Sequence, residues 1–122
     1  ADDARDLRLM LALHIDRDER FDVVGHAEDG VEALEVVAAQ RPDVLLLDLA
    51  MPRLDGLEVL ARLRDEGSDL AVVVVSGFSA GDVADQALAL GARAYVEKGA
   101  ALTTLVDDLE GWLRRDDARS VR

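Results

Sequence analysis

The 122-residue chain contains no cysteine, two prolines, one lysine, and only one tryptophan, one tyrosine and two phenylalanines. Without cysteine, a disulfide framework, a thiolate nucleophile and a zinc knuckle are all excluded. Bases are also scarce, because 14 Lys and Arg stand against 26 Asp and Glu, which gives a formal net charge of −12. Since phosphate contacts need clustered bases, we expect no direct DNA or RNA binding by this domain.

Long hydrophobic runs are missing as well. The longest aliphatic stretch, residues 70–75, is far below the roughly 20 residues of a membrane helix. The chain does not open with a basic flank and an apolar stretch of the signal-peptide kind. We therefore expect no membrane partner and a cytoplasmic location. The length fits one domain, expected over residues 1–114, with 115–122 as a polar tail or the start of a linker.

Hydrophobic residues make up half of the chain, and their spacing alternates between two patterns. Helical spacing recurs around residues 7–15, 31–38, 57–63, 83–88 and 102–113, and short strand-like runs cover 21–27, 44–48, 70–76 and 92–97. Residues 44–47 and 71–75 are apolar at every position, which is typical of parallel strands buried on both faces. The pattern predicts an α/β fold with right-handed crossovers.

Polar side chains gather where the predicted strands end, which is where open α/β sheets bind ligands. Asp48 and Ser76 close two strands, Lys98 follows a third, and Asp2 and Asp3 directly precede the first helix. Clustered carboxylates favour a hard divalent cation such as Mg²⁺ or Mn²⁺. An Asp at such a metal can act as a nucleophile and form an acyl phosphate, with a Lys or a hydroxyl compensating the phosphoryl charge.

Each of these residues also has a purely structural interpretation. Asp48 could be a cap or turn residue, Asp2 and Asp3 could cap the first helix, and Ser76 could be an ordinary strand-end hydroxyl. Lys98 is a stronger indication of a functional site, because the other 13 bases are Arg. The planar guanidinium of Arg cannot replace a compact ammonium in a tight phosphate site. We interpret the Asp-Gly pair at 55–56 as a turn and helix start without a chemical role.

Four motifs together resemble the receiver domain of two-component response regulators. They are Asp2-Asp3, LLLDLAMPRLDG at 45–56, VVVVSG at 72–77 and GARAYVEKG at 91–99. They occur in the order and spacing of the family, and the resemblance extends from about residue 2 to residue 113. It implies a flavodoxin-like, doubly wound parallel sheet of strand order 2-1-3-4-5 with five helices.

The resemblance also implies a role for each matching residue. Asp48 would be the phosphoacceptor, Asp3 a direct Mg²⁺ ligand, Asp2 a ligand through water, the Ala50 carbonyl a further ligand, Ser76 and Lys98 partners of the phosphoryl group, and Tyr95 a switch aromatic. A sensor histidine kinase or a phosphotransfer protein would supply the phosphoryl group. The fourth helix, the last strand and the fifth helix would then present a changed surface to a second copy, an output domain or a separate protein.

Two residues that differ from the family pattern limit how fast the acyl phosphate could be hydrolysed. Ala50 and Phe78 flank the expected phosphoryl position and cannot orient a water, so we expect only self-phosphorylation from phosphodonors and slow self-dephosphorylation. An Asp-nucleophile phosphatase would need a second Asp where Ala50 stands. A degenerate receiver that acts as a phosphorylation-independent scaffold is the other alternative. Gly99, where many receivers have proline, points weakly to regulators with helix-turn-helix output domains.

The first strand of the family is absent from the chain, although the order 2-1-3-4-5 places it centrally. A gap of unpaired backbone in a sheet is not stable. We expect an N-terminal piece to be lacking; less favoured alternatives are a strand donated by another chain or by residues 120–122. If Ala1 is the true terminus, its ammonium lies beside the metal site and weakens cation binding.

Overall fold

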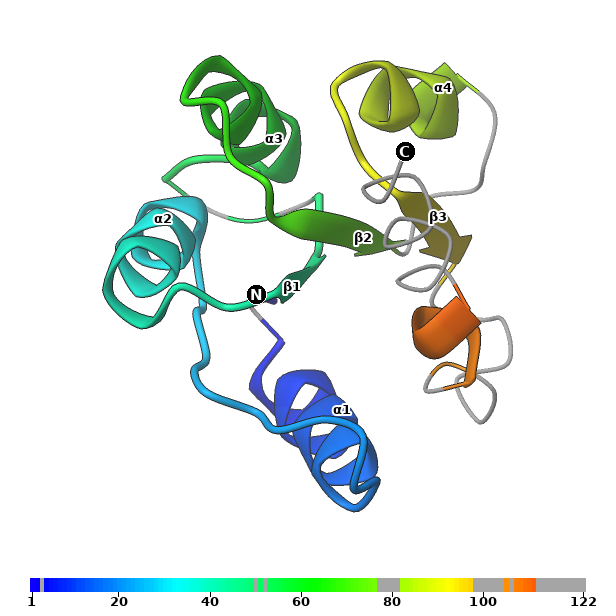
Figure 1. Cartoon of the computed structure of the whole chain (residues 1–122). Coiled ribbons are helices and arrows are strands. Elements are labelled where there is room, and N and C mark those ends of the chain that lie inside the picture. Colours follow the sequence, from blue (N-terminus) through cyan, green and yellow to red (C-terminus); the bar gives the residue numbers. More distant parts are fainter. Residues whose placement is uncertain are drawn as a thin grey trace.

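The computed structural model describes residues 1–2, 4–49, 51, 53–76, 82–97, 105 and 107–111 (Figure 1). Their elements are α1 (Arg5–Asp16), α2 (Gly30–Gln40), β1 (Val44–Leu47), α3 (Gly56–Asp65), β2 (Ala71–Ser76), α4 (Asp82–Ala89) and β3 (Ala94–Glu97). Residues 105 and 107–111 are helical too. The predicted tail at 115–122 lies outside the described residues. No helix within these ranges is long and apolar enough to cross a membrane.

The three strands form one parallel sheet of order β1-β2-β3. Leu47 of β1 lies opposite Val74 of β2, and Ser76 at the end of β2 lies opposite Glu97 of β3. All six residues of β2 are buried, as expected for a parallel strand covered on both faces. The α/β class and the strands predicted at 44–48, 70–76 and 92–97 are therefore confirmed.

Helices cover both faces of the sheet, and each face has its own hydrophobic cluster (Figure 1). On one face, Leu47 and Val74 pack with residues of α2, α3 and α4, among them Leu60. On the other face, Val73 and Val75 pack with Leu11 of α1 and with Leu105 and Leu109. The chain thus folds in three layers, with the sheet in the middle.

The prediction of a strand at residues 21–27 is wrong. Within the described residues they have no strand pairing, and backbone hydrogen bonds of residues 1–2 link them to β1. The backbone nitrogen of Ala1 donates to the Leu46 carbonyl at 2.7 Å, Asp48 N donates to the Ala1 carbonyl at 2.9 Å, and Asp2 N donates to the Ala27 carbonyl at 3.0 Å. Residues 21–27 therefore do not belong to the sheet in the described structure, which contains the 3-4-5 part of the predicted strand order.

Substitution Leu60→Ala is expected to lower the free energy of unfolding by about 2–5 kcal/mol, because it leaves a cavity under α3. The Leu60 side chain is 2% exposed and packs against the sheet. Urea denaturation followed by circular dichroism measures the change. As a control, Leu88→Ala on α4 removes a side chain that is 46% exposed and should change stability by less than about 0.5 kcal/mol. Equal effects of the two variants would contradict the assigned core.

Candidate functional site

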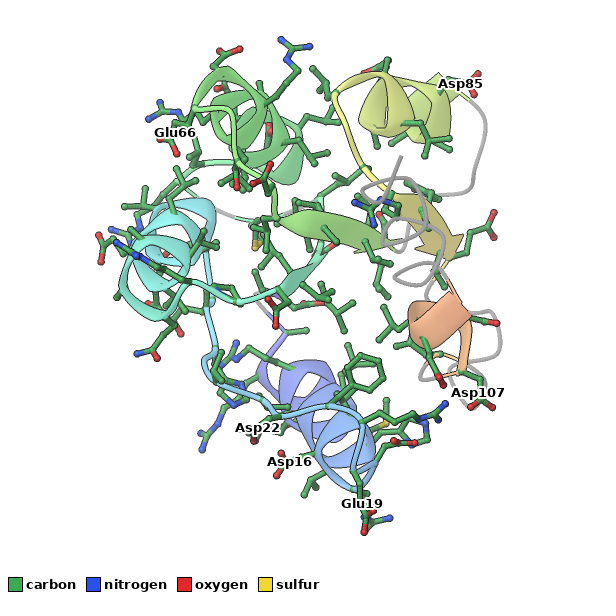
Figure 2. All side chains as sticks on the ribbon, in the orientation of Figure 1. Asp16, Glu19, Asp22, Glu66, Asp85 and Asp107 are labelled. Atoms are coloured by element: carbon green, nitrogen blue, oxygen red, sulfur yellow. The ribbon has the colours of Figure 1, made fainter. Side chains whose placement is uncertain are left out.

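Three acidic side chains of the described residues are buried, namely Asp2, Asp29 and Asp48. Most of the others lie at the periphery. Figure 2 labels Asp16, Glu19, Asp22, Glu66, Asp85 and Asp107, which point away from the sheet. Burying a carboxylate is costly without compensating partners. The three buried carboxylates are therefore the candidates for a structural or functional role.

Asp48 directly follows the last residue of β1, at the carboxyl end of the sheet. Its residue is 4% exposed, and its backbone N–H is held by the Ala1 carbonyl. Ligands of open parallel sheets bind at this end. The structure therefore places the predicted phosphoacceptor at the expected rim.

Asp2 lies beside Asp48 in the register of the sheet. The two hydrogen bonds of Ala1 place it opposite Leu47, so the next residue, Asp2, lies opposite Asp48. Asp2 is 4% exposed, and its Oδ1 accepts a hydrogen bond from Ala4 N at 2.8 Å. The residue that caps α1 is Ala4. For Asp2, the alternative role as the helix cap is therefore wrong.

Ser76 brings a hydroxyl to the same rim. It is the last residue of β2 and is fully buried, and β2 pairs directly with β1. Lys98 follows Glu97, the residue opposite Ser76, in the sequence. Lys98 itself lies outside the described residues, as do Asp3 and Ala50, so the structure brings together three of the predicted residues: Asp2, Asp48 and Ser76.

Tyr95 lies one strand away, on β3, opposite Val74. It is half-buried and packs against the hydrophobic cluster that contains Leu47. This position agrees with ordinary packing of an aromatic side chain at the edge of the described sheet. The predicted change of its rotamer stays a prediction.

The donor atoms at this rim suit a hard divalent cation. Two buried carboxylates, on Asp2 and Asp48, occupy neighbouring positions of adjacent extended segments. Carboxylate oxygens are the ligands that Mg²⁺ prefers. The residues present therefore fit the implied metal, with Asp3 and the Ala50 carbonyl as the further predicted ligands.

A second acidic cluster, which the sequence analysis did not single out, lies at the start of α2. Carboxylate oxygens of Glu28, Asp29 and Glu32 lie within 4.8 Å of one another. Asp29 Oδ1 accepts from Glu32 N at 2.9 Å, and its Oδ2 accepts from the Arg53 guanidinium at 2.6 and 2.9 Å. One oxygen of Asp29 thus caps α2 and the other binds Arg53. These partners account for the cluster without a metal.

Arg53 belongs to the loop that leads from Asp48 to α3. It adopts a left-handed backbone conformation with φ of 64°, and its side chain ties this loop to the first turn of α2. The two segments are in close contact, because an added Cβ at Gly30 would lie 1.9 Å from the Leu54 carbonyl oxygen. An Asp with a Glu three residues later is a helix-start pattern that could have revealed the cap, but nothing in the sequence indicates Arg53 as its partner.

The Glu32 backbone N–H and the Arg53 guanidinium hold the pKa of Asp29 below its ordinary value of 3.8. A carboxyl whose pKa is lowered by folding stabilises the folded state above its unfolded pKa, and this contribution disappears as the pH falls through the folded value. The wild-type protein should therefore have a higher urea midpoint than Asp29→Asn at neutral pH. The difference should shrink as the pH falls below 3.8.

An Arg53→Met background provides the control for this measurement. The substitution removes one of the two causes that lower the pKa of Asp29. The difference in urea midpoint between Asp and Asn at position 29 should therefore become smaller at neutral pH. If the difference in urea midpoint between the wild-type protein and Asp29→Asn stays constant down to the lowest pH at which the protein is folded, the interaction of Asp29 with Arg53 is contradicted.

Gly56 explains how α3 approaches the site. It is the first residue of α3, and its N–H donates to the Leu49 carbonyl at 2.9 Å. An added Cβ would lie 2.5 Å from the Asp48 carbonyl oxygen and 2.6 Å from Leu49 Cα. The Asp55 carboxylate accepts from Glu58 N at 3.0 Å and caps the helix. The prediction of a turn and helix start at 55–56 is confirmed, and the glycine is required because the helix packs on the backbone that carries Asp48.

Substitution Gly56→Ala is expected to destabilise the fold and to shift the amide resonance of Asp48, since the clashing atoms belong to the backbone. Gly111→Ala is the matched control, because an added Cβ there meets nothing within 4 Å. In a helix this change should be neutral or stabilising by up to about 1 kcal/mol. Urea denaturation and backbone NMR of the two variants test the contact, and equal midpoints would argue against it.

Comparison with known proteins places these features in a family. A family model described as response regulator receiver domain matches residues 1–110. The response regulator MprA of Mycobacterium avium is 46% identical, with 78% of this chain and 43% of that protein aligned. MprA of Mycobacterium leprae is 47% identical, with 75% of this chain and 42% of that protein aligned. The aligned region spans less than half the length of these relatives.

Solved structures of response regulators have the same fold as this chain. The signal receiver domain of NarL from Mycobacterium tuberculosis has a TM-score of 0.85 and 33% identity, covering 90% of this chain and 89% of that one. A DNA-binding response regulator of the LuxR family from Staphylococcus aureus has a TM-score of 0.86 and 28% identity, covering 92% of this chain and 93% of that one. The flavodoxin-like fold is thereby confirmed. The chain belongs to the response regulator receiver domains, the signalling modules of two-component systems.

Proposed function

We propose that this receiver domain is a cytoplasmic phosphoacceptor switch in which Asp48 takes a phosphoryl group from a histidine kinase or a phosphotransfer protein. The observation that carries the proposal is the placement of buried Asp48 at the carboxyl end of β1, opposite buried Asp2 and next to the strand that ends in buried Ser76. Membership in the receiver family supports the same reaction.

The reaction is a transfer between two side chains. One Oδ of Asp48 attacks the phosphorus of a phosphohistidine in line with the P–N bond, so an O–P bond forms as the P–N bond breaks. The imidazole of the donor leaves with the electron pair and is then protonated by water. Asp2, Asp3, Asp48 and the Ala50 carbonyl would hold a Mg²⁺ or Mn²⁺ ion. When bound, this ion neutralises charge on the transferred phosphoryl oxygens.

Ser76 and Lys98 respond to the new group. Phosphorylation replaces a carboxylate of charge −1 by a group of about −1.5 to −2 with additional strong acceptor oxygens. The Ser76 hydroxyl donates a hydrogen bond to one of these oxygens, and the Lys98 ammonium pairs with another. Tyr95, on the neighbouring strand β3, then changes its rotamer as Ser76 moves.

The output surface consists of α4, β3 and the helix that contains residues 107–111. Phosphorylation shifts a pre-existing equilibrium between two arrangements of this surface, and it is read by a second copy, an output domain or a separate protein. The relatives named MprA are more than twice as long as the aligned region, and one structural neighbour is a DNA-binding regulator. We therefore place the domain in a transcription regulator whose DNA contacts lie outside it.

Incubation with acetyl phosphate and Mg²⁺ is expected to add one phosphoryl group per chain, detected by intact-mass spectrometry. Asp48→Asn should abolish the adduct, because an amide is not a nucleophile of this kind. Asp55→Asn is the matched control: it changes an acid on the same loop that caps α3, and it should leave the adduct in place. An unchanged adduct in Asp48→Asn would overturn the assignment of the phosphoacceptor.

The same experiment separates the alternatives. A folded protein that acquires no adduct would be a phosphorylation-independent scaffold, and turnover of many phosphodonor equivalents would indicate an Asp-nucleophile phosphatase. Decay of the adduct should be slow, because Ala50 and Phe78 cannot orient a water. Substitutions Ala50→Asn and Phe78→Glu are expected to accelerate it.

A further inference from the structure

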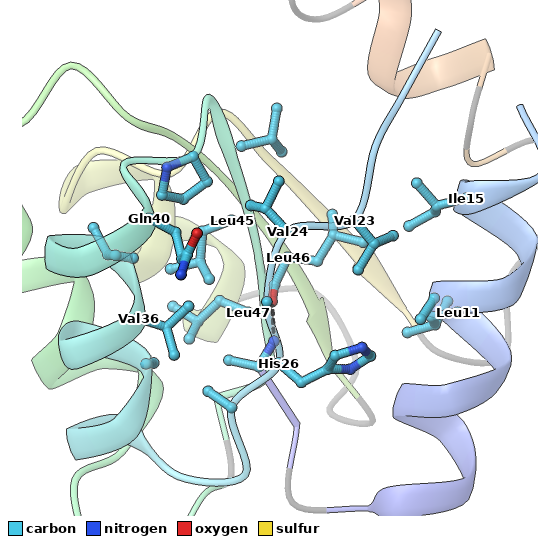
Figure 3. A pocket seen from close by; sticks show the side chains of 18 of the residues that line it. Leu11, Ile15, Val23, Val24, His26, Val36, Gln40, Leu45, Leu46 and Leu47 are labelled. Carbon is cyan, nitrogen blue, oxygen red and sulfur yellow. Dashed lines mark hydrogen bonds between the residues drawn. The ribbon is translucent and has the colours of Figure 1, made fainter. Parts of the chain in front are cut away.

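Arg8 is a charged residue on the inward face of α1. It precedes Leu11 by three residues and Ile15 by seven, and positions at this spacing share one face of a helix. Figure 3 shows Leu11 and Ile15 pointing from α1 towards the sheet layer. Arg8 is half-buried, whereas Arg5 at the start of the same helix is exposed. A charge on an inward face is costly unless it has a polar partner.

The partner of Arg8 is a backbone carbonyl of the candidate site. Arg8 Nη1 donates a hydrogen bond to Asp2 O at 2.7 Å. Because the donor is charged, this hydrogen bond is stronger than one between two neutral groups. Arg8 Nε is buried too, and it has no hydrogen-bond partner among the described residues. The guanidinium is thus withdrawn from water, and the bond to Asp2 compensates part of that cost.

The stability of α1 does not account for this arginine. The start of a helix leaves backbone N–H groups without partners, and a guanidinium can only donate hydrogen bonds. A cation near the N-terminus also opposes the helix dipole, and Arg8 is the fourth residue of α1. The side chain therefore acts on Asp2, which lies outside the helix.

Asp2 forms hydrogen bonds with three different parts of the chain. Its N–H donates to Ala27 O at 3.0 Å, its Oδ1 accepts from Ala4 N at 2.8 Å, and its carbonyl accepts from Arg8. The first bond fixes the backbone on one side of the residue, and the second fixes the carboxylate. The third fixes the carbonyl, and with it the plane of the peptide group that joins Asp2 to Asp3, since peptide groups are rigid.

We propose that Arg8 is a positioning residue of the cation site, which holds the peptide group between the neighbouring acids Asp2 and Asp3 in the orientation that bound Mg²⁺ requires. The inference rests on the proposed function, because that function makes these two acids cation ligands. Mg²⁺ demands nearly ideal octahedral geometry, and groups that orient metal ligands contribute to affinity without touching the ion. Arg8 acts through Asp2, since a guanidinium has no acceptor atom with which to bind a cation.

Two possible roles of Arg8 predict opposite changes in Mg²⁺ affinity. If Arg8 acted only through its charge, it would repel the cation, and its removal would make Mg²⁺ bind more tightly. If Arg8 orients the Asp2 carbonyl, its removal makes Mg²⁺ bind more weakly. The direction in which the dissociation constant changes therefore distinguishes the two roles.

Substitution Arg8→Met removes the charge and the donors but keeps a long, unbranched side chain of similar helix propensity. We expect the dissociation constant for Mg²⁺, measured by an NMR titration of the metal-free protein, to rise about tenfold. Arg8→Lys keeps a charged donor and should regain part of the affinity.

Arg5→Met is the matched control, because it removes the same charge from an exposed position of the same helix. Exposed charges are screened by salt, so this variant should change the dissociation constant by less than about twofold. Unchanged or tighter Mg²⁺ binding by Arg8→Met would overturn the inference. An equal loss of affinity in Arg5→Met would overturn it as well, because it would indicate a general effect on α1.

The wild-type protein provides a second measurement if Arg8→Met does not fold. The guanidinium protons of Arg8 should exchange with water more slowly than those of Arg5, as observed by NMR of the metal-free protein. Equal exchange at the two positions would show that Arg8 does not hold the Asp2 carbonyl in solution, and the inference would be wrong.

These measurements need no phosphodonor, so they separate the inference from the proposed function. A wild-type protein that forms the Asp48 adduct, together with an Arg8→Met variant of equal Mg²⁺ affinity, contradicts the inference alone. A wild-type protein that binds no Mg²⁺ contradicts the cation site of the proposed function, and the inference with it. If the inference is correct, Arg8→Met needs more Mg²⁺ for the half-maximal rate of adduct formation but still acquires one phosphoryl group per chain at saturating Mg²⁺.

Discussion

Burial of β2 on both faces is the constraint on which the rest of the structure depends. All of its residues are buried, so its backbone groups must be paired within the sheet, which they are through β1 and β3. The helices of both layers pack on this strand and its neighbours. Because the strands are parallel, their carboxyl ends meet at one rim, and this rim holds Asp48 and Ser76.

The loop behind this rim is held by contacts that have no chemical role of their own. Gly56 lets α3 start against the backbone of Asp48 and Leu49, while Arg53 binds the carboxylate that caps α2. The two contacts connect the backbone of the candidate phosphoacceptor to two helices of one layer. Preorganisation of this kind reduces the conformational freedom that a reacting group must lose.

Residues 1–2 link β1 to the candidate phosphorylation site. Ala1 bonds to β1, and the next residue, Asp2, lies opposite Asp48. Asp2 N also donates to the Ala27 carbonyl, so the backbone around Asp2 is held from both sides. The carboxylate pair therefore depends on main-chain hydrogen bonds between segments that are distant in the sequence.

The sequence by itself determined the α/β class, three of the four expected strands and the positions of Asp48 and Ser76, because continuous apolar runs and strand-end residues are local features. It also indicated the helix start at Asp55. It failed at residues 21–27, which have no strand pairing in the described structure, and it did not reveal the contact between Arg53 and Asp29, which are 24 residues apart. Only the tertiary structure decided these points, because strand pairing and ion pairing depend on which distant segments the fold brings together.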